Sequence, residues 1–198
     1  FIFFIFHLNK QLGFMPTINE VKNAIADNGS LFLDQINETH IDELLDIDIE
    51  RTKQYDGIIL SGAPILLTEE KTDQYIKDTA WIKEIKIPIL GICFGHQLLG
   101  ILHGAQVSLC KEDRNWQEII IEQSSTLFNY IRKPYRMVED HTEEVTLPED
   151  FKLLATSKVC KNEAMQHKIK PLFGVQFHPE VSERGGLQLL KNFCKTCF

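Results

Sequence analysis

Hydrophobic and polar positions alternate along the first half of the chain in a pattern that predicts strands joined by amphipathic helices. Strands alternating with helical stretches of this length form βαβ units and a mostly parallel sheet. The apolar runs lie at 2–6, 31–33, 57–60 and 87–93, and the amphipathic stretches at 18–26, 41–49, 72–85 and 97–102. Two of the runs are nearly continuous in Ile and Leu, which is typical of strands covered by helices on both faces.

The second half of the chain has shorter apolar runs with few helical stretches between them, which indicates antiparallel strands added to the sheet. These runs lie at Val107, 119–121, 136–138, 153–155 and 173–177, and residues 185–194 form a closing amphipathic helix. The predicted fold is an open, mostly parallel α/β sheet of the flavodoxin-like or Rossmann-like kind, with helices on both faces. No repeat or Pro/Gly-rich linker interrupts residues 1–198, so we expect a single domain.

Composition and charge restrict the function. With 43% hydrophobic and 25% charged residues, the chain has the composition of a soluble globular protein. Its net charge of −7 argues against a nucleic-acid partner, which would require clustered Lys and Arg. The first apolar run is too short to span a membrane, which needs about 20 residues. Five scattered cysteines, an odd number, favour a reducing compartment and a cytoplasmic protein.

Cys93 lies in a G-x-C-x-G pattern where an apolar strand meets a helix. Gly91 and Gly95 allow a sharp, strained turn that lifts the side chain clear of the sheet, as in a nucleophile elbow with Cys in place of Ser. The partial positive charge at the start of the following helix favours the reactive thiolate. A lone cysteine is more often a small buried core residue, but this surrounding pattern favours a nucleophile.

His178 and Glu180 follow an apolar strand near the end of the chain. A thiol nucleophile needs a base that takes its proton and returns it to the leaving amine, and imidazole does this near neutral pH. Glu180 can reach the far ring nitrogen and fix the tautomer, which completes a Cys-His-Glu triad. Pro179 restricts the pair. A histidine at a strand end is otherwise more often structural, and the cysteine elbow makes the base the better interpretation.

The segment Ser61-Gly62-Ala63-Pro64 is a third small-residue turn at a strand end. Attack on an amide creates an oxyanion, which needs preorganised N–H donors. The backbone N–H groups of Ala63 and Phe94 are the expected donors, and small residues at Gly62 and Ala63 permit close approach. Without the other two motifs, an ordinary strand-to-loop turn would be equally good.

Other polar residues carry weaker signals. Cys194 and Cys197 have the spacing of a redox or half-zinc site, but no second pair exists, so we expect no metal. His141 lies among acidic residues at 139–144, which we interpret as a solvated loop, with a site or partner contact as the alternative. His96 follows the elbow and is expected to pack or hydrogen bond. Cys110 and Cys160 indicate only burial.

The three motifs, in this order, resemble the class I glutamine amidotransferases, whose glutaminase domains carry an S-G-G-P turn, a G-x-C-x-G-x-Q elbow and a terminal H-P-E. Segments 140–145, 153–157 and 162–167 are most similar to the glutaminase subunit or domain of GMP synthetase. The resemblance implies hydrolysis of L-glutamine through a γ-glutamyl thioester, and it makes Gln97 and Gly62 candidate substrate contacts. Ala63 stands where the family has a second glycine, which could stiffen this turn.

The chain has no P-loop or other nucleotide-binding glycine pattern. It therefore cannot activate an ammonia acceptor by itself, and the expected partner is an ATP-dependent synthetase subunit. We expect no cofactor. Two alternatives stay open: a stand-alone γ-glutamyl hydrolase or peptidase with the same triad, and a non-catalytic regulatory module that keeps the fold for binding.

Overall fold

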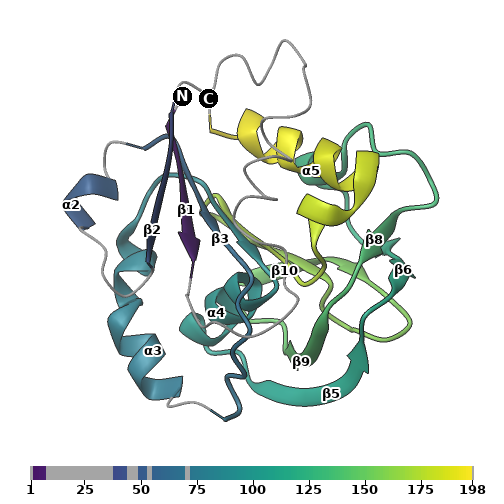
Figure 1. The fold of residues 1–198 in the computed structure, drawn as a ribbon, viewed down its shortest axis with the longest axis horizontal. Coiled ribbons are helices and arrows are strands. Elements are labelled where there is room, and N and C mark those ends of the chain that lie inside the picture. Colours follow the sequence, from purple (N-terminus) through teal and green to yellow (C-terminus); the bar gives the residue numbers. More distant parts are fainter. Residues whose placement is uncertain (1, 8–37, 44–48, 53–54, 70–71, 198) are drawn as a thin grey trace.

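The computed structural model describes residues 2–7, 38–43, 49–52, 55–69 and 72–197, and its largest element is an eight-stranded sheet (Figure 1). The strands are β1 (Ile2–His7), β2 (Glu38–Glu43), β3 (Gly57–Leu60), β4 (Ile89–Ile92), β7 (Ile120–Ile121), β10 (Phe151–Thr156), β11 (Ala164–His167) and β12 (Leu172–Val175). Their order across the sheet is β2-β1-β3-β4-β12-β11-β10-β7.

The sheet changes direction at β12. From β2 through β1, β3 and β4 to β12 all neighbouring strands are parallel. Beyond β12, the pairs with β11, β10 and β7 are antiparallel. This confirms the predicted α/β fold, with a parallel sheet from the first half extended by antiparallel strands of the second. The parallel strands β3, β4 and β12 place their carboxyl ends at one edge of the sheet.

Helices cover both faces of the sheet because neighbouring residues in each central strand point to opposite faces. On one face Ile58 and Ile89 pack against α4, while on the other Ile59 and Leu90 pack in the same core as α5. All four strand residues are fully buried. In Figure 1 the teal α4 and the yellow α5 are well separated. The helices are α2 (Ile49–Thr52), α3 (Thr72–Asp78), α4 (Phe94–Leu102) and α5 (Glu183–Lys195).

Two of the expected helical stretches differ in the structure. Part of the amphipathic stretch predicted at 41–49 belongs to β2, which pairs along six residues with β1. Its alternation of Ile41 between polar neighbours also fits a strand, so pairing decides. The stretch predicted at 72–85 divides at Thr79, whose hydroxyl donates to the Tyr75 carbonyl at 2.5 Å; a 3₁₀ turn follows at Ala80–Glu84. The predictions for 18–26 and 31–33 lie outside the described residues.

Two short antiparallel ribbons stand beside the main sheet. One pairs β5 (Val107–Asp113) with β9 (His141–Val145), and the other pairs β6 (Trp116–Glu118) with β8 (Arg136–Val138). The interpretation of 139–144 as a solvated loop is therefore wrong. Glu139, His141 and Glu143 are buried, because alternate residues of β9 face the protein interior. Among the described residues, no helix has the length and apolar character required to cross a membrane.

Candidate active site

Cys93 lies between β4 and α4, in a backbone conformation that directs its side chain toward the carboxyl edge of the sheet. Its φ of 49° and ψ of −106° are unusual for a residue with a Cβ. Its N–H donates to the carbonyl of Val175 on β12 at 2.9 Å, and its carbonyl accepts from the N–H of Gln97 at 3.0 Å. These bonds join the strained residue to a central strand and to the first turn of the helix, which is the geometry of a nucleophile elbow.

The two glycines of the elbow are required for close packing. A Cβ on Gly91 would overlap the carbonyl group of Gly95, and a Cβ on Gly95 would overlap the carbonyl oxygen of Leu60 at the end of β3. The turn thus fits only when both positions lack a side chain. This agrees with the role that the G-x-C-x-G pattern predicts for them.

His178 and Glu180 form a buried pair beyond the end of β12. His178 Nδ1 lies 2.7 Å from Oε1 of Glu180, and the two side chains are 1% and 2% exposed. Burial opposes a charge on the imidazole, but the Glu180 carboxylate and the Cys93 sulfur outweigh it and hold the pKa of His178 well above its ordinary value. The Nε2 atom is buried and has no hydrogen-bond partner among the described residues. The histidine is therefore placed to exchange a proton through Nε2.

The turn after β3 passes directly beside the cysteine and the histidine. A Cβ on Gly62 would lie 3.0 Å from Cε1 of His178 and 3.5 Å from Cβ of Cys93. Ala63 is buried in the core beneath the turn and does not have a positive φ. The residue that replaces the second family glycine thus adopts an ordinary backbone conformation here. Within the described part of the chain, neither the Ala63 N–H nor the Phe94 N–H has an acceptor, so both are free for an oxyanion.

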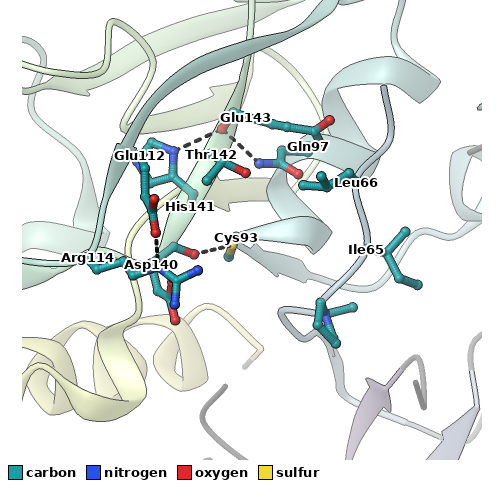
Figure 2. A pocket seen from close by; sticks show the side chains of 12 residues that line it. Ile65, Leu66, Cys93, Gln97, Glu112, Arg114, Asp140, His141, Thr142 and Glu143 are labelled. Atoms are coloured by element: carbon teal, nitrogen blue, oxygen red, sulfur yellow. Dashed lines mark hydrogen bonds and ion pairs between the residues drawn. The ribbon is translucent and has the colours of Figure 1, made fainter. Parts of the chain in front are cut away.

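A cavity of about 350 Å³ opens over the sulfur of Cys93 (Figure 2). One wall comes from the segment after β3, and the facing wall from β5, β9 and the residue before β9. Arg114 lies at this second wall, where it pairs with Glu112 and, at 3.5 Å, with Asp140. The cavity thus has apolar, cationic and anionic surfaces close to one nucleophile. Its lining residues are Ala63, Pro64, Ile65, Leu66, Cys93, Gln97, Glu112, Arg114, Asp140, His141, Thr142 and Glu143.

Two glutamines connect the sulfur to the cavity wall. Gln176 on the segment after β12 donates to the Cys93 sulfur at 3.6 Å. Its side-chain oxygen accepts from Gln97 at 3.2 Å, and Gln97 also donates to the main-chain carbonyl of Glu143 at 3.1 Å. Gln97 therefore lies in the cavity as predicted for a substrate contact, but its amide nitrogen is committed to protein acceptors. The sequence did not single out Gln176.

Glu143 joins the two walls of the cavity. Its carboxylate accepts hydrogen bonds from the N–H groups of Leu67 and Thr68, both at 2.8 Å, and from the Thr68 hydroxyl at 2.5 Å. The side chain is buried, so these three donors satisfy a group that would otherwise be costly to bury. The bonds hold the segment after Ala63 against β9. Alternate burial at 139, 141 and 143 is the signal that could have placed this residue at the site.

Comparison with known proteins assigns this arrangement to a family. The family model for class-I glutamine amidotransferases matches residues 19–197. The chain belongs to this family. This amidotransferase is 42% identical over 153 residues to the glutamine-hydrolysing GMP synthase subunit of Methanocaldococcus jannaschii, covering 76% of this chain and 78% of that protein. It is 37% identical over 191 residues to the same subunit of Pyrococcus furiosus, covering 87% of this chain and 97% of that one.

Solved structures show the same fold. A protein from Thermoplasma acidophilum described as a putative GMP synthase subunit superposes with a TM-score of 0.81 at 26% identity, covering 99% of this amidotransferase and 93% of that chain. A glutamine amidotransferase from Thermotoga maritima superposes with a TM-score of 0.69 at 21% identity, covering 98% of this chain and 80% of that one. The second likeness concerns the fold alone.

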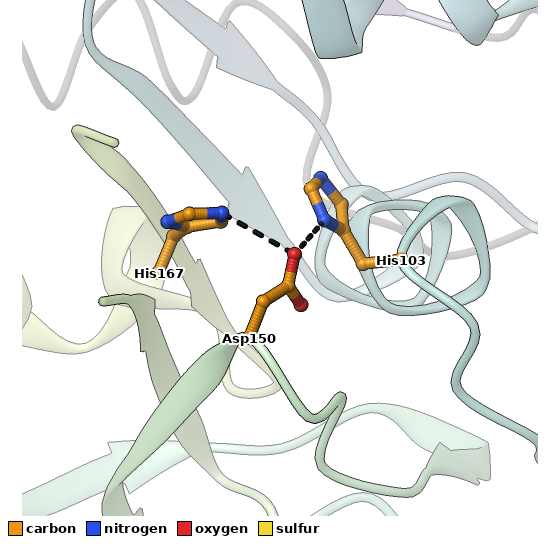
Figure 3. Close-up of side chains that lie close together, drawn as sticks. All are labelled: His103, Asp150 and His167. Carbon is orange, nitrogen blue, oxygen red and sulfur yellow. Dashed lines mark hydrogen bonds and ion pairs between the residues drawn. The ribbon is translucent and has the colours of Figure 1, made fainter. Parts of the chain in front are cut away.

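A second polar cluster in the amidotransferase lies at the far end of α4. Asp150 stands between two imidazoles (Figure 3), with Oδ2 at 2.6 Å from His103 Nδ1 and 3.3 Å from His167 Nε2. His167 Nδ1 accepts from the N–H groups of Ile169 and Lys170 at 3.0 and 2.9 Å, so its hydrogen is on Nε2. A metal would need a lone pair at Nε2. These three residues therefore form a hydrogen-bonded tether between elements.

The remaining residues noted in the sequence have structural surroundings. His96 is fully buried against Gly174, and burial lowers its pKa to about 3, so it is a neutral packing residue. Cys194 and Cys197 lie at the end of α5, and burial raises the pKa of Cys197 to about 12. All five cysteines are free. Cys110 lies 3.6 Å from His141 Nδ1, and burial raises its pKa to about 11, which makes it a poor nucleophile.

Proposed function

We propose that this protein hydrolyses L-glutamine to glutamate and ammonia with Cys93, His178 and Glu180 as the triad, and that it supplies the ammonia to an ATP-dependent synthetase subunit. The observation that carries the proposal is the meeting of three features at one cavity: an elbow cysteine, a buried His-Glu pair and free backbone N–H groups. The relatives named as glutamine-hydrolysing subunits of GMP synthase make a synthetase that aminates a purine nucleotide the first partner to test.

In the proposed reaction the Cys93 sulfur attacks the side-chain amide carbon of glutamine. The tetrahedral oxyanion accepts hydrogen bonds from the backbone N–H groups of Ala63 and Phe94. His178, held by Glu180, transfers its proton to the leaving nitrogen, so ammonia departs and a γ-glutamyl thioester remains. His178 then takes a proton from water as it attacks the thioester, which releases glutamate and regenerates the thiolate–imidazolium pair.

Cys93→Ala should lower ammonia release from glutamine by about 10⁴-fold, because no other group can form the thioester. Ammonia release is measured for both proteins, alone and with a GMP-forming synthetase subunit. The complex with Cys93→Ala should still form product when ammonia is supplied directly. If wild type and variant release ammonia equally under every condition, the proposal is wrong. Rapid turnover of γ-glutamyl peptides without glutamine turnover would instead indicate a γ-glutamyl hydrolase.

The charged wall of the cavity suits the zwitterionic end of glutamine, with Arg114 facing the α-carboxylate and Asp140 the α-ammonium group. Arg114→Ala should raise KM for glutamine about tenfold and change kcat little, because it removes binding that substrate and transition state share. Arg132→Ala, at an exposed position outside the cavity, is the matched control. An unchanged KM would exclude Arg114 as a substrate contact.

A further inference from the structure

Two buried glutamates lie behind the cavity wall. Glu139 is 1% exposed and Glu163 is 0% exposed, and their carboxyl groups are close enough to interact directly. None of their four oxygens has a hydrogen bond of ordinary geometry among the described residues. In the same part of the chain, the only ion-pair neighbour of either is His141. Two ionised carboxylates in such surroundings would repel each other without a compensating cation.

Glu139 lies between two residues that contact the proposed catalytic groups. The carbonyl of Val138 accepts from the N–H of His178 at 2.8 Å. The carbonyl of Asp140 accepts from the Cys93 sulfur at 3.7 Å. A displacement of Glu139 would therefore move the main chain at both the nucleophile and the base.

Glu163 borders the same centre from the opposite side. Its carbonyl accepts from the N–H of Gln176 at 2.8 Å, and Gln176 donates from its side chain to the Cys93 sulfur at 3.6 Å. Its own N–H donates to Ala155 on β10 at 3.0 Å. A link between the two glutamate side chains thus closes a ring of main chain around the cysteine.

The tautomer of His141 indicates where a proton lies. Its Nδ1 is 2.9 Å from the carbonyl of Glu143, which can only accept, so Nδ1 carries the hydrogen. Burial lowers the pKa of this histidine, so the ring is neutral and Nε2 presents a lone pair. That lone pair is 3.5 Å from Oε2 of Glu139. A charged carboxylate would face it unfavourably, whereas a protonated Glu139 would not.

The electrostatics of the pair agree with this geometry. Burial raises the pKa of Glu163 to about 7, and burial together with the Glu163 charge raises the pKa of Glu139 well above its usual range. Carboxyl groups that interact this closely titrate as one unit. The other groups that face the pair are Cys93, Asp113, Glu144, Ser157, Cys160 and His178.

We propose that Glu139 and Glu163 share a proton between their carboxyl groups, and that this protonated pair is a positioning element holding the main chain on both sides of Cys93. Its effect on glutamine hydrolysis rests on the proposed function, whereas the shared proton does not. The two parts are therefore tested separately.

Infrared difference spectroscopy at pH 7 tests the proton. Wild type and the exposed control Glu149→Gln should show the C=O stretch of a protonated, buried carboxyl group, which shifts in D₂O. Glu139→Gln and Glu163→Gln should each lose it, because the remaining carboxylate ionises and accepts from the new amide. Absence of the band in wild type, or its survival in both variants, would overturn the shared proton.

Thermal stability gives a second readout with a defined sign. A carboxyl pair whose pKa is raised on folding stabilises the protein at low pH and loses this contribution as pH rises through the folded pKa. The Tm of wild type relative to the double variant Glu139→Gln, Glu163→Gln should therefore fall between about pH 5 and pH 8. A difference independent of pH would contradict the proposal. Comparison with the double variant cancels the titration of the nearby histidines.

Alkylation of Cys93 by iodoacetamide, followed on the Cys93 peptide by mass spectrometry, tests positioning without requiring glutaminase activity. Glu139→Leu should slow alkylation about tenfold, and Glu139→Gln should stay within about threefold of wild type, because an amide can still bond to Glu163. Equal rates in all three proteins, or equal loss in Gln and Leu, would overturn the positioning role. If Glu139→Leu does not fold, the comparison of Glu139→Gln with wild type decides.

Discussion

His178→Gln is expected to lower kcat/KM for glutamine by about 10⁴-fold, or ~5 kcal/mol of transition-state stabilisation, with little change in KM. Glutamine fills a similar volume but cannot take a proton from the Cys93 thiol or return one to the leaving nitrogen. Glu180→Gln should have a smaller effect, because the imidazole remains but loses the carboxylate that orients and charges it. Glu183→Gln, which is exposed three residues along, is the matched control. A normal rate in His178→Gln would remove the histidine from the mechanism.

The same pair sets a pH dependence. The Glu180 carboxylate and the Cys93 sulfur raise the pKa of His178 against the effect of burial, so the imidazolium persists above its usual range. Activity should fall on the alkaline side as pH rises through this raised pKa, and Glu180→Gln should move that limb to lower pH. The corresponding contribution to folding stability is complete below about pH 6.5 and is lost as pH rises through the folded pKa. A pH profile of kcat/KM that does not move in Glu180→Gln would contradict this.

Gly95→Ala is expected to destabilise the protein by about 3 kcal/mol or more, or to prevent folding, because its Cβ would overlap backbone rather than a movable side chain. The overlapped atom is the carbonyl oxygen of Leu60, and the Leu60 Cβ would be 2.7 Å away. The clash pushes the end of β3 away from the elbow. Urea denaturation followed by circular dichroism measures the loss.

Gly185→Ala is the matched control for this experiment. Gly185 lies in α5, and an added Cβ would meet nothing nearer than 3.7 Å. Since alanine favours a helix interior by about 1 kcal/mol over glycine, this variant should be as stable as wild type or more stable. Equal stability of both alanine variants would show that the elbow tolerates a side chain and that its glycines are not sterically required.

The parts of the fold that sequence could predict are those with local signals. The continuous Ile and Leu of 58–60 and 89–92 predicted buried strands, and the glycines around Cys93 predicted the turn that follows them. The His178–Glu180 contact was predictable because two residues separate its members by a fixed, short distance. These features depend on neighbouring residues, so the sequence contains most of the information that determines them.

The parts that could not be predicted depend on contacts between distant segments. The acidic stretch around His141 has the composition of a surface loop, but pairing with β5 buries alternate members of it. Glu143 meets its donors at Leu67 and Thr68, and Gln176 meets Cys93, only after the sheet has formed. Whether an acidic residue is solvated or buried was therefore decided by register, which composition does not specify.

The central claim is that Cys93 forms a γ-glutamyl thioester. The most direct test is mass spectrometry of the protein after acid quenching during turnover of isotopically labelled glutamine, with Cys110→Ala as a cysteine control. A labelled glutamyl group should appear on the peptide that contains Cys93, should be retained in Cys110→Ala and should be absent in Cys93→Ala. Ammonia release with no label on that peptide, or with the label on a different cysteine, would contradict the account.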